Sequence, residues 1–333
     1  MNGETPIVSF RDVHKHFAPH AAMFGKALVR AVDGVTFDVG AGRVLGIAGE
    51  SGSGKSTLAN LLVGLERATA GAIEVNGHVM KAKPDRGLRR AVQMVFQDPF
   101  ASLNPRFTVG RSVEEPMLIH GVGTPAQRRD AAIAALEKAE LRPGRTFVSR
   151  YPHELSGGQR QRVAIARAVV LEPKLLVADE PVSMLDVSVR AGILRLLKRL
   201  VTEQQMAMVF ITHDLSIVAH ICDELAIMYR GRIVERGPVR DVLRAPAHPY
   251  TRALIAAIPV EHPSLRRKRL AMKGEPMSPI DPPAHCHLVS RCPFARPICS
   301  EVPADLVEVT PGHATRCVRF QREHDNGSWN PTP

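Results

Sequence analysis

Residues 44–62 have the sequence VLGIAGESGSGKSTLANLL, in which an apolar run comes before a glycine-rich segment and an amphipathic segment follows. This order predicts a strand, a loop and a helix. The loop matches the pattern G-x-x-x-x-G-K-[S/T], whose glycines let backbone N–H groups surround phosphate oxygens. In such a loop Lys55 reaches the β- and γ-phosphates and Ser56 can bind Mg²⁺, while the following helix adds the positive end of its dipole. The predicted nucleotide-phosphate site consists of Gly49, Glu50, Ser51, Gly52, Ser53, Gly54, Lys55, Ser56 and Thr57.

The composition indicates a globular protein with anionic partners. With 333 residues the chain exceeds the size at which a single core stops growing, which predicts one large domain with an extension, or two domains. Hydrophobic residues make up 44% and charged residues 23%, as in ordinary soluble proteins. No apolar run reaches transmembrane length and the start lacks the regions of a signal peptide, so we expect a cytosolic location. The net charge of +11 favours a nucleotide, a nucleic acid or an acidic membrane face as partner.

Three apolar segments end in polar side chains suited to phosphate chemistry. Residues 174–180, KLLVADE, are typical of a strand buried on both faces that ends in two acids. Groups at the carboxyl ends of such strands lie in the crevice where α/β folds bind ligands, so we expect Asp179 to reach Mg²⁺ and Glu180 to face an attacking water. The predicted strand 207–212 ends at His213, and the predicted strand 93–96 ends at Gln97.

Two further features have both a functional and an ordinary structural interpretation. Phe17 precedes the phosphate loop, between short predicted strands at residues 7–10 and 35–39, and its ring could stack on a nucleobase or fill the core. Residues 155–162, LSGGQRQR, begin a helix within the mainly helical region 109–170. Its N-terminus is either a second anion site or a plain serine cap followed by glycines.

Taken together, these segments resemble an ATP-binding-cassette (ABC) ATPase over about residues 7–255. The resemblance rests on the order of GESGSGKST, Gln97, LSGGQ, LLVADE, the SMLD of residues 183–186 and His213. Four more segments resemble the ATPase subunits of bacterial oligopeptide and dipeptide importers: the loop between Phe17 and Val32, residues 97–105, residues 180–183 and residues 248–254. Residues 274–276, 282–283 and 286–317 resemble the C-terminal extension of that family.

The resemblance implies an α/β fold with three parts. An ABC-type P-loop nucleotide-binding domain would occupy residues 1–255, with a helical subdomain inserted at about residues 98–165, and a small cysteine-containing extension would occupy residues 256–333. ATP and Mg²⁺ are the implied cofactors, with Ser56, Gln97 and Asp179 at the metal ion. Phe17 would stack on adenine, where Tyr is more usual.

The resemblance also divides the catalytic roles between two polypeptides. Glu180 would polarise the attacking water, and His213 would contact the γ-phosphate, with Gln97 beside them. The residues that would complete the site of the opposite subunit are Ser156, Gly157, Gly158 and Gln159, with Asp186 at the dimer interface.

The implied function is ATP hydrolysis that drives import of di- and oligopeptides. The partners would be a second, related ATPase subunit or a second copy of this chain, two membrane-spanning permease subunits docked through residues 97–105, and indirectly an extracytoplasmic solute-binding protein. The chain would then lie on the cytoplasmic face of the bacterial inner membrane, with no specific nucleic acid bound. One alternative is an importer for another solute such as nickel; the other is an ABC ATPase that acts on nucleic acid, which the net charge would suit.

Four of the five cysteines crowd the C-terminal part of the chain. Cytosolic chains rarely use disulfides, and Cys222, alone in an apolar context, is predicted to be a core thiol. The others have C-x5-C-x6-C spacing plus a distant fourth thiol, wider than the usual pairs of a structural zinc site. Four thiolates can also hold an iron–sulfur cluster, and the resemblance suggests a [4Fe–4S] cluster, with zinc or no metal as alternatives. The residues concerned are Cys286, Cys292, Cys299 and Cys317.

Overall fold

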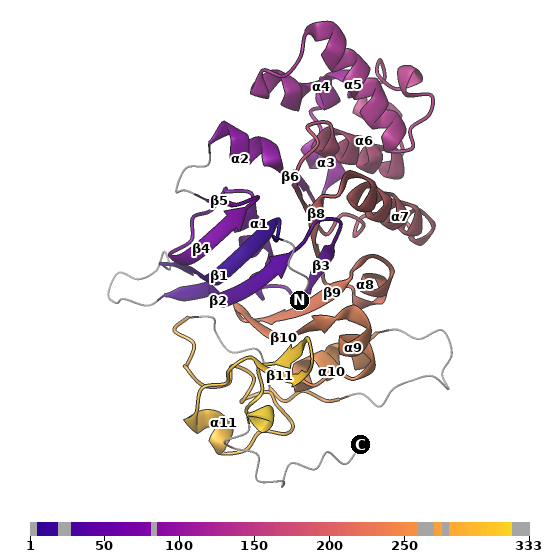
Figure 1. Ribbon diagram of the computed structural model, residues 1–333. Helices are drawn as coiled ribbons and strands as arrows, with labels where there is room; N and C mark the ends of the chain where they lie inside the picture. Colours follow the sequence, from indigo (N-terminus) through magenta and orange to yellow (C-terminus); the bar gives the residue numbers. More distant parts are fainter. Residues whose placement is uncertain (1–4, 19–27, 81–84, 259–269, 275–279, 322–333) are drawn as a thin grey trace.

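Two sheets organise the protein in the computed structural model, which describes residues 5–18, 28–80, 85–258, 270–274 and 280–321. Within these residues a four-stranded antiparallel sheet has the order β2-β1-β4-β5 and an eight-stranded sheet has the order β11-β12-β10-β9-β3-β8-β7-β6 (Figure 1). The strands are β1 (Val8–Phe17), β2 (Val29–Val39), β3 (Val44–Ala48), β4 (Ala70–Val75), β5 (His78–Val79), β6 (Val92–Val95), β7 (Leu175–Asp179), β8 (Ala207–Thr212), β9 (Glu224–Tyr229), β10 (Arg232–Pro238), β11 (Val307–Thr310) and β12 (His313–Thr315).

The parallel strands β9, β3, β8, β7 and β6 lie side by side in the larger sheet, with β6 at its edge. Every residue of β3 and β8 is buried, as the continuous apolar runs predicted. Helix α1 (Lys55–Leu62) lies between the two sheets, where Leu58 and Leu61 share one buried cluster with Phe10 of the small sheet and Ile47 of the large one. The phosphate loop, which joins β3 to α1, is therefore fixed at both ends by core packing.

Two predicted strands are longer in the structure than the sequence indicated. β1 continues from the predicted 7–10 segment to Phe17, and β2 begins at Val29, well before residue 35. Register shifts beyond Phe10 and a left-handed Asp12 (φ 46°) interrupt the pairing, so the polar residues of this stretch do not alternate regularly. Residues 19–27 of the loop that follows lie outside the described residues.

Helices gather at one end of the molecule (Figure 1). The region 109–170 is mainly helical, as predicted, and the helix expected at residues 125–140 is α5, which begins after the capping box of Thr124 and Gln127. These elements are α3 (Pro99–Ser102), α4 (Val109–His120), α5 (Pro125–Lys138), the 3₁₀ turns η1 (Gly144–Thr146) and η2 (Pro152–Glu154), and α6 (Gly157–Val169). The boundaries of the inserted subdomain stay a prediction.

The other helices cover the sheets, and the C-terminal residues add to the larger one. They are α2 (Arg86–Ala91), α7 (Val187–Gln204), α8 (Leu215–Ile221), α9 (Val239–Arg244), α10 (Pro249–Ala256) and α11 (Ile298–Glu301). Strand β12 pairs with β10, and Leu288 and Cys292 belong to the buried cluster that contains Tyr250. These C-terminal residues are thus packed on the larger sheet and its buried cluster, at the end of the molecule opposite α4 and α5 (Figure 1).

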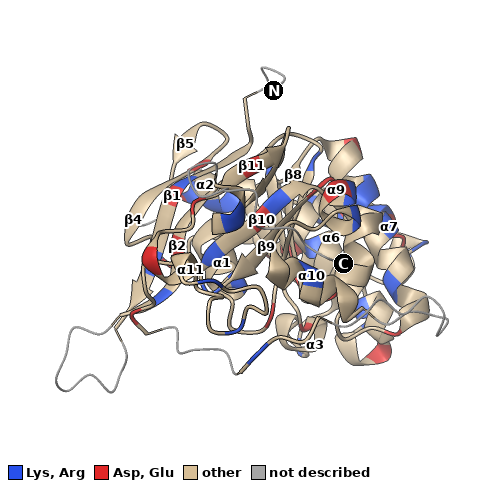
Figure 2. Cartoon of the chain, turned by 90° about the horizontal axis from the view of Figure 1, so that it is seen from below, with Lys and Arg blue, Asp and Glu red and all other residues tan. Residues whose placement is uncertain are grey.

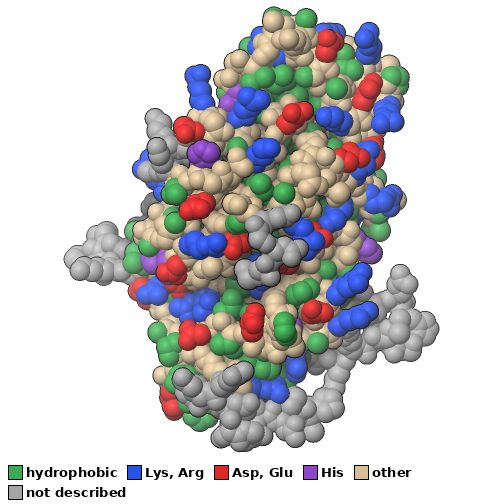
Figure 3. Space-filling model, viewed as in Figure 1, with side chains coloured by type: hydrophobic (Ala, Val, Ile, Leu, Met, Phe, Trp, Pro, Cys, Tyr) green, Lys and Arg blue, Asp and Glu red, His purple; other side chains and the backbone are tan. Residues whose placement is uncertain are grey.

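Charged side chains are spread over several elements. Figure 2 shows Lys and Arg on α7 and around α9 and α10, and Figure 3 shows acidic and basic side chains interspersed over one face. None of the described helices combines the length and apolar character needed to span a membrane. Cys222 is buried, as predicted for a core thiol, and burial raises its pKa, with the charge of Asp223 adding to the effect.

Candidate active site

The phosphate loop curls around the ammonium group of Lys55. Its Nζ donates to the carbonyl oxygens of Gly49 and Glu50, both at 2.7 Å. Gly54 has a φ of 106°, and a Cβ there would lie 2.1 Å from the carbonyl oxygen of Ala31, so a side chain is excluded at this position. The loop is therefore preformed by its own backbone and by the neighbouring strand β2.

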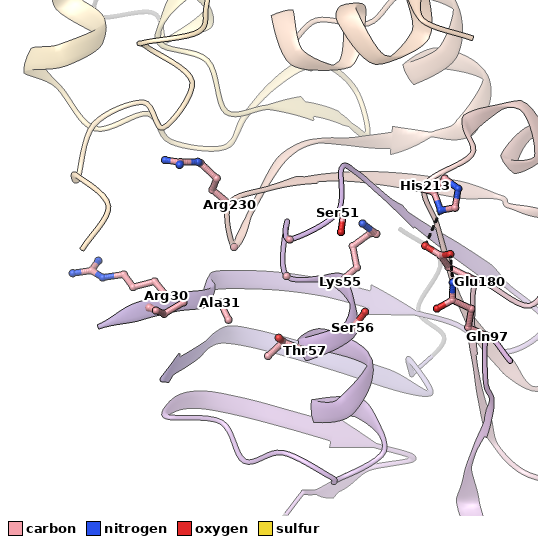
Figure 4. Close-up of a pocket in the computed structure, with 14 residues that line it drawn as sticks. Arg30, Ala31, Ser51, Lys55, Ser56, Thr57, Gln97, Glu180, His213 and Arg230 are labelled. Carbon is pink, nitrogen blue, oxygen red and sulfur yellow. Dashed lines mark hydrogen bonds and ion pairs between the residues drawn. The ribbon is translucent and has the colours of Figure 1, made fainter. Parts of the chain in front are cut away.

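A cleft of about 620 Å³ lies over this loop (Figure 4). Its size is that of ordinary small-molecule sites. Its lining residues come from β2, the phosphate loop, the ends of three parallel strands and the β9–β10 turn: Val29, Arg30, Ala31, Ser51, Gly52, Gly54, Lys55, Ser56, Thr57, Gln97, Glu180, His213, Arg230 and Gly231. Of the predicted phosphate loop, Gly49, Glu50 and Ser53 are outside this lining and hold the loop in shape.

Three predicted catalytic residues meet at one end of the cleft. Gln97 follows β6, Glu180 follows β7 and His213 follows β8, which are neighbouring strands of the sheet. Gln97 Nε2 donates to Glu180 Oε2 at 2.9 Å, and His213 Nδ1 lies 2.8 Å from Glu180 Oε1 (Figure 4). Both oxygens of the Glu180 carboxylate thus have a side-chain partner. Glu180 itself has a left-handed φ of 47°, a conformation that non-glycine residues rarely adopt and that recurs at functional sites.

Opposite charges interact at the base of the cleft. Burial lowers the pKa of Lys55, and the carboxylates of Glu180, Asp179 and Glu50 counteract this shift. Burial raises the pKa of Asp179, Glu180 adds to the increase, and Lys55 opposes it. A cation near Asp179 would relieve the repulsion between these two neighbouring acids. Ser56 and Gln97 line the cleft, whereas Asp179, the last residue of β7, is outside its lining residues. The hydroxyl, amide and carboxylate oxygens of these three side chains are the kind of donor that Mg²⁺ prefers.

Phe17 and the LSGGQ segment are outside the residues that line the cleft. Phe17 ends β1 opposite Val29, which does line it, and the ammonium of Lys15 lies 4.6 Å from the Phe17 ring centroid. Ser156 caps α6: its Oγ accepts from the N–H of Gln159 at 3.3 Å, and Gln159 Oε1 accepts from the N–H of Ser156 at 3.0 Å. Gly157 and Gly158 form the first turn of α6, and Asp186 precedes α7.

The sequence did not identify the basic side chains at the other end of the cleft. Figure 4 shows Arg30 and Arg230 on the side away from Glu180. Arg230 and Gly231 form the turn of the β9–β10 hairpin, with φ values of 48° and 79°. That β9 lies next to β3, and so brings the turn to the phosphate loop, cannot be read from local sequence.

Two residues that support the phosphate loop from behind were also missed. The hydroxyl of Tyr250 accepts from the N–H of Glu50 at 2.9 Å. Arg291 Nη1 donates to Glu50 Oε2 at 3.2 Å and lies 3.5 Å from the hydroxyl of Tyr229. The sequence signals were the resemblance of residues 248–254 to importer ATPases for Tyr250 and the resemblance of residues 286–317 to the C-terminal extension for Arg291.

A phosphate loop, a carboxylate held by a histidine and a glutamine, and an LSGGQ segment at the start of a separate helix define an ATP-binding cassette. The family model for ABC transporters matches residues 32–183, and the model for the C-terminal region of oligopeptide/dipeptide transporters matches residues 234–299. Among solved structures, the dimeric post-hydrolysis state of the cassette MJ0796, bound to ADP and Pi, has a TM-score of 0.60 and 32% identity and covers 70% of this chain and 99% of that one. The cassette CbiO1 of Clostridium perfringens has a TM-score of 0.62 and 27% identity, with 73% and 97% coverage.

Curated relatives match nearly the whole chain. A putative peptide import ATP-binding protein of Brucella ovis is 44% identical over 319 residues, covering 95% of this chain and 98% of the relative. The oligopeptide transport ATP-binding protein AppF of Bacillus subtilis is 43% identical, with 95% and 98% coverage, and the di/tripeptide transport ATP-binding protein DppF of Pseudomonas aeruginosa is 45% identical, with 89% and 93% coverage. The chain belongs to the ABC transporter family, among the ATP-binding subunits with the oligopeptide/dipeptide transporter C-terminal region, and it is an ATPase.

Proposed function

We propose that this chain hydrolyses ATP to energise the import of di- and oligopeptides through a membrane transporter. The observation that carries the proposal is the match of residues 234–299 to the oligopeptide/dipeptide transporter C-terminal region, next to a complete cassette. The full-length similarity to proteins named for peptide import supports the same cargo.

In this proposal Glu180 polarises the attacking water. The bonds from Gln97 and His213 fix the orientation of its carboxylate, and positioning is most of what phosphoryl transfer requires of a protein. Lys55 and the loop N–H groups would hold the phosphates, and Ser56, Gln97 and Asp179 would hold Mg²⁺, which would neutralise charge on the phosphates when bound. His213, on the exposed side of Glu180, would contact the γ-phosphate.

We further propose that the active form contains a second ATPase subunit, either a related chain or a second copy. Ser156–Gln159 and Asp186 would then act in the partner's site, which agrees with their position outside the lining of this chain's cleft. The dimeric state of the structural relative MJ0796 supports this arrangement. Phe17, at the edge of the cleft, would stack on adenine.

Docking of permease subunits through residues 97–105 stays a prediction, and a groove that ends next to this segment, although no residue of the segment lines the groove, supports an interaction site here. The groove measures about 330 Å³ and runs between β6 and α4, lined among others by Val63 and Glu115. Its apolar side chains are unusually open to solvent, with exposed fractions of 67% for Leu65, 65% for Ile119 and 42% for Phe96. Exposed apolar patches rimmed by polar residues mark interaction sites. The chain would thus lie on the cytoplasmic face of the inner membrane and meet an extracytoplasmic solute-binding protein only through the permeases.

Peptide uptake tests the cargo and the role of Glu180 together. Cells lacking the chain are complemented with wild type, with Glu180→Gln or with the control Glu203→Gln on the exposed face of α7, at matched levels. We expect uptake of labelled di- and oligopeptides only with wild type and the control. In the assembled complex Glu180→Gln should lower turnover by roughly 10² or more, the usual worth of a general base, while ATP binding persists. Uptake that never depends on the chain would refute the cargo assignment, and normal turnover of the variant would refute the role of Glu180.

We also propose that the four C-terminal cysteines hold a [4Fe–4S] cluster. All four line one small cavity of about 30 Å³, between α10 and α11. Tetrahedral zinc would bring its sulfur ligands to about 3.8 Å from one another, but among the described residues no three of these sulfurs lie within 4.8 Å of one another. The observation that supports a four-thiolate site is therefore the cavity that all four cysteines line. The residues are Cys286, Cys292, Cys299 and Cys317.

Metal analysis after anaerobic purification tests the cluster. Burial, the largest effect, raises the pKa of Cys286 to about 11 and that of Cys317 to about 12, so these thiols need a metal to become ligating thiolates at neutral pH. We expect iron and sulfide in equal amounts, and loss of both in Cys286→Ser. A chain that holds stoichiometric zinc and no iron would refute the proposal.

A further inference from the structure

Two histidines and an aspartate converge on the strands β1 and β2, outside the lining of the ATP cleft. His14 Nδ1 lies 3.2 Å from Asp33 Oδ1, and His16 Nε2 lies 4.0 Å from the same oxygen. One nitrogen or oxygen of each side chain lies within 4.8 Å of those of the other two. In the part of the chain that the structure describes, no other three His, Cys, Asp or Glu side chains meet this closely.

We propose that His14, His16 and Asp33 form a binding site for a divalent transition-metal ion, with Zn²⁺ as its reference ligand. Zinc bonds of about 2.0–2.2 Å to nitrogen and oxygen place tetrahedral ligands about 3.4 Å apart. The separations of 3.2 and 4.0 Å bracket this value, so a small rotation of the His16 ring closes the site. Two imidazoles and one carboxylate are a common zinc set that leaves a fourth position open to water.

The surrounding side chains orient two of the three ligands. Asp12 Oδ1 lies 3.1 Å from His14 Nε2, and Arg232 Nε donates to Asp33 Oδ2 at 2.7 Å. Metal-binding histidines commonly donate their second ring N–H to a carboxylate, which fixes the tautomer. A proton on Nδ1 lets His14 donate to Asp33 Oδ1 without a metal, and a bound metal ion would take the place of that proton while Nε2 faces Asp12.

His16 contributes the observation that points most directly to a ligand. Its Nε2 is buried and has no hydrogen-bond partner among the residues that the structure describes. Buried polar atoms are nearly always paired, so this nitrogen requires a proton acceptor, a donor or a metal ion. It faces Asp33, whose side chain is only 4% exposed and whose Oδ1 has, within the described part of the chain, only His14 as a hydrogen-bond partner.

The positive charges of two guanidinium groups, those of Arg30 and Arg232, lower the affinity of this site for a cation. Arg232 is bound to the oxygen of Asp33 that faces away from the histidines, so it leaves Oδ1 free. Arg30 Nη1 lies 3.8 Å from Oδ1, beyond hydrogen-bond distance, and its side chain is 37% exposed, so it can move into solvent when a metal binds. Asp12 and Asp33 balance these two positive charges.

Metal titration of the full, tag-free chain tests the site with Zn²⁺ and Co²⁺ alone. We expect wild type to bind one more equivalent than the double variant His14→Gln/His16→Gln. The control is His220→Gln, which changes an exposed histidine on α8. Asp12→Asn should weaken binding about 10-fold, the usual effect of losing an outer-shell partner. Thermal melts show whether each variant is folded.

The Co²⁺ spectrum separates this site from the cysteines. Thiolate ligands give Co²⁺ an intense charge-transfer band, whereas imidazole and carboxylate ligands give only weak visible bands. We expect the weak bands to disappear in the double variant and a thiolate band to be added in His16→Cys. An unchanged number and affinity of Co²⁺ equivalents in the double variant would overturn the proposal, as would a wild-type spectrum with thiolate bands alone.

Discussion

Removing the hydroxyl of Tyr250 should weaken ATP binding although this residue lies behind the phosphate loop. Tyr250 is only 1% exposed, and its ring packs on Tyr229 with centroids 4.6 Å apart, so Tyr250→Phe keeps the packing and deletes one oxygen. That oxygen accepts the N–H of Glu50 at 2.9 Å. Leaving this N–H without its acceptor costs about 1–2 kcal/mol. If this entire cost destabilises the loop conformation that binds phosphate, the dissociation constant of ATP rises about 5- to 30-fold.

Calorimetric titration of the purified chain with ATP measures this effect, and thermal melts report any loss of stability. Tyr151→Phe is the matched control, because this tyrosine is 40% exposed and belongs to the helical end of the molecule. Unchanged ATP affinity together with an unchanged melting temperature in Tyr250→Phe would show that the bond does not hold the loop. Equal weakening in both variants would show that the effect is not specific to the loop.

Two further predictions concern helix packing and acid stability. Gly158→Ala should lower the melting temperature, because its Cβ would lie 2.6 Å from Val189 Cγ1 and overpacking costs about 1–3 kcal/mol; Gly157→Ala, whose Cβ meets nothing closer than 3.7 Å, should not. Burial lowers the pKa of His248 to about 4, so the unfolded chain binds more protons below pH about 6.5. The contribution of His248 to the free energy of unfolding is therefore fully present above this pH. It should fall by up to about 3 kcal/mol as the pH drops towards 4. His248 Nδ1 accepts from the N–H of Tyr250 and caps α10, and in His248→Asn an amide oxygen can replace this nitrogen. Melts across this range should show a smaller decline in His248→Asn and an unaltered one in His220→Gln; equal declines in all three proteins would exclude this histidine as the cause.

The centre of the fold could be predicted because its signals are local. Strands buried on both faces of a parallel sheet are continuous apolar runs, and those that end at Glu180 and His213 are read directly from sequence. The strand that leads to Gln97 is a shorter, half-buried edge strand, but it too is mainly apolar. Since parallel strands present their carboxyl ends on one edge, these three residues could be expected near the phosphate loop. The structure brings them within hydrogen-bond distance of one another.

The rest of the site depends on pairings between distant segments, which local patterns do not specify. Arg30 and Arg230 reach the cleft only because β2 and the β9–β10 turn both lie beside the phosphate loop. The long β1–β2 pairing was missed because register shifts and polar residues hide the alternation of a strand. The cluster of His14, His16 and Asp33 was missed for the same reason, since its members come together only through that pairing.

The two bonds to Glu50 have a consequence for how a newly made chain matures. Glu50 leaves the ribosome early, but its partners Tyr250 and Arg291 follow 200 and 241 positions later. At about 5–20 residues per second, translation needs on the order of 10–50 s to supply them. Nascent cassettes should therefore acquire full affinity for ATP only near the end of synthesis, and chains that terminate before Tyr250 should compete poorly for the nucleotide.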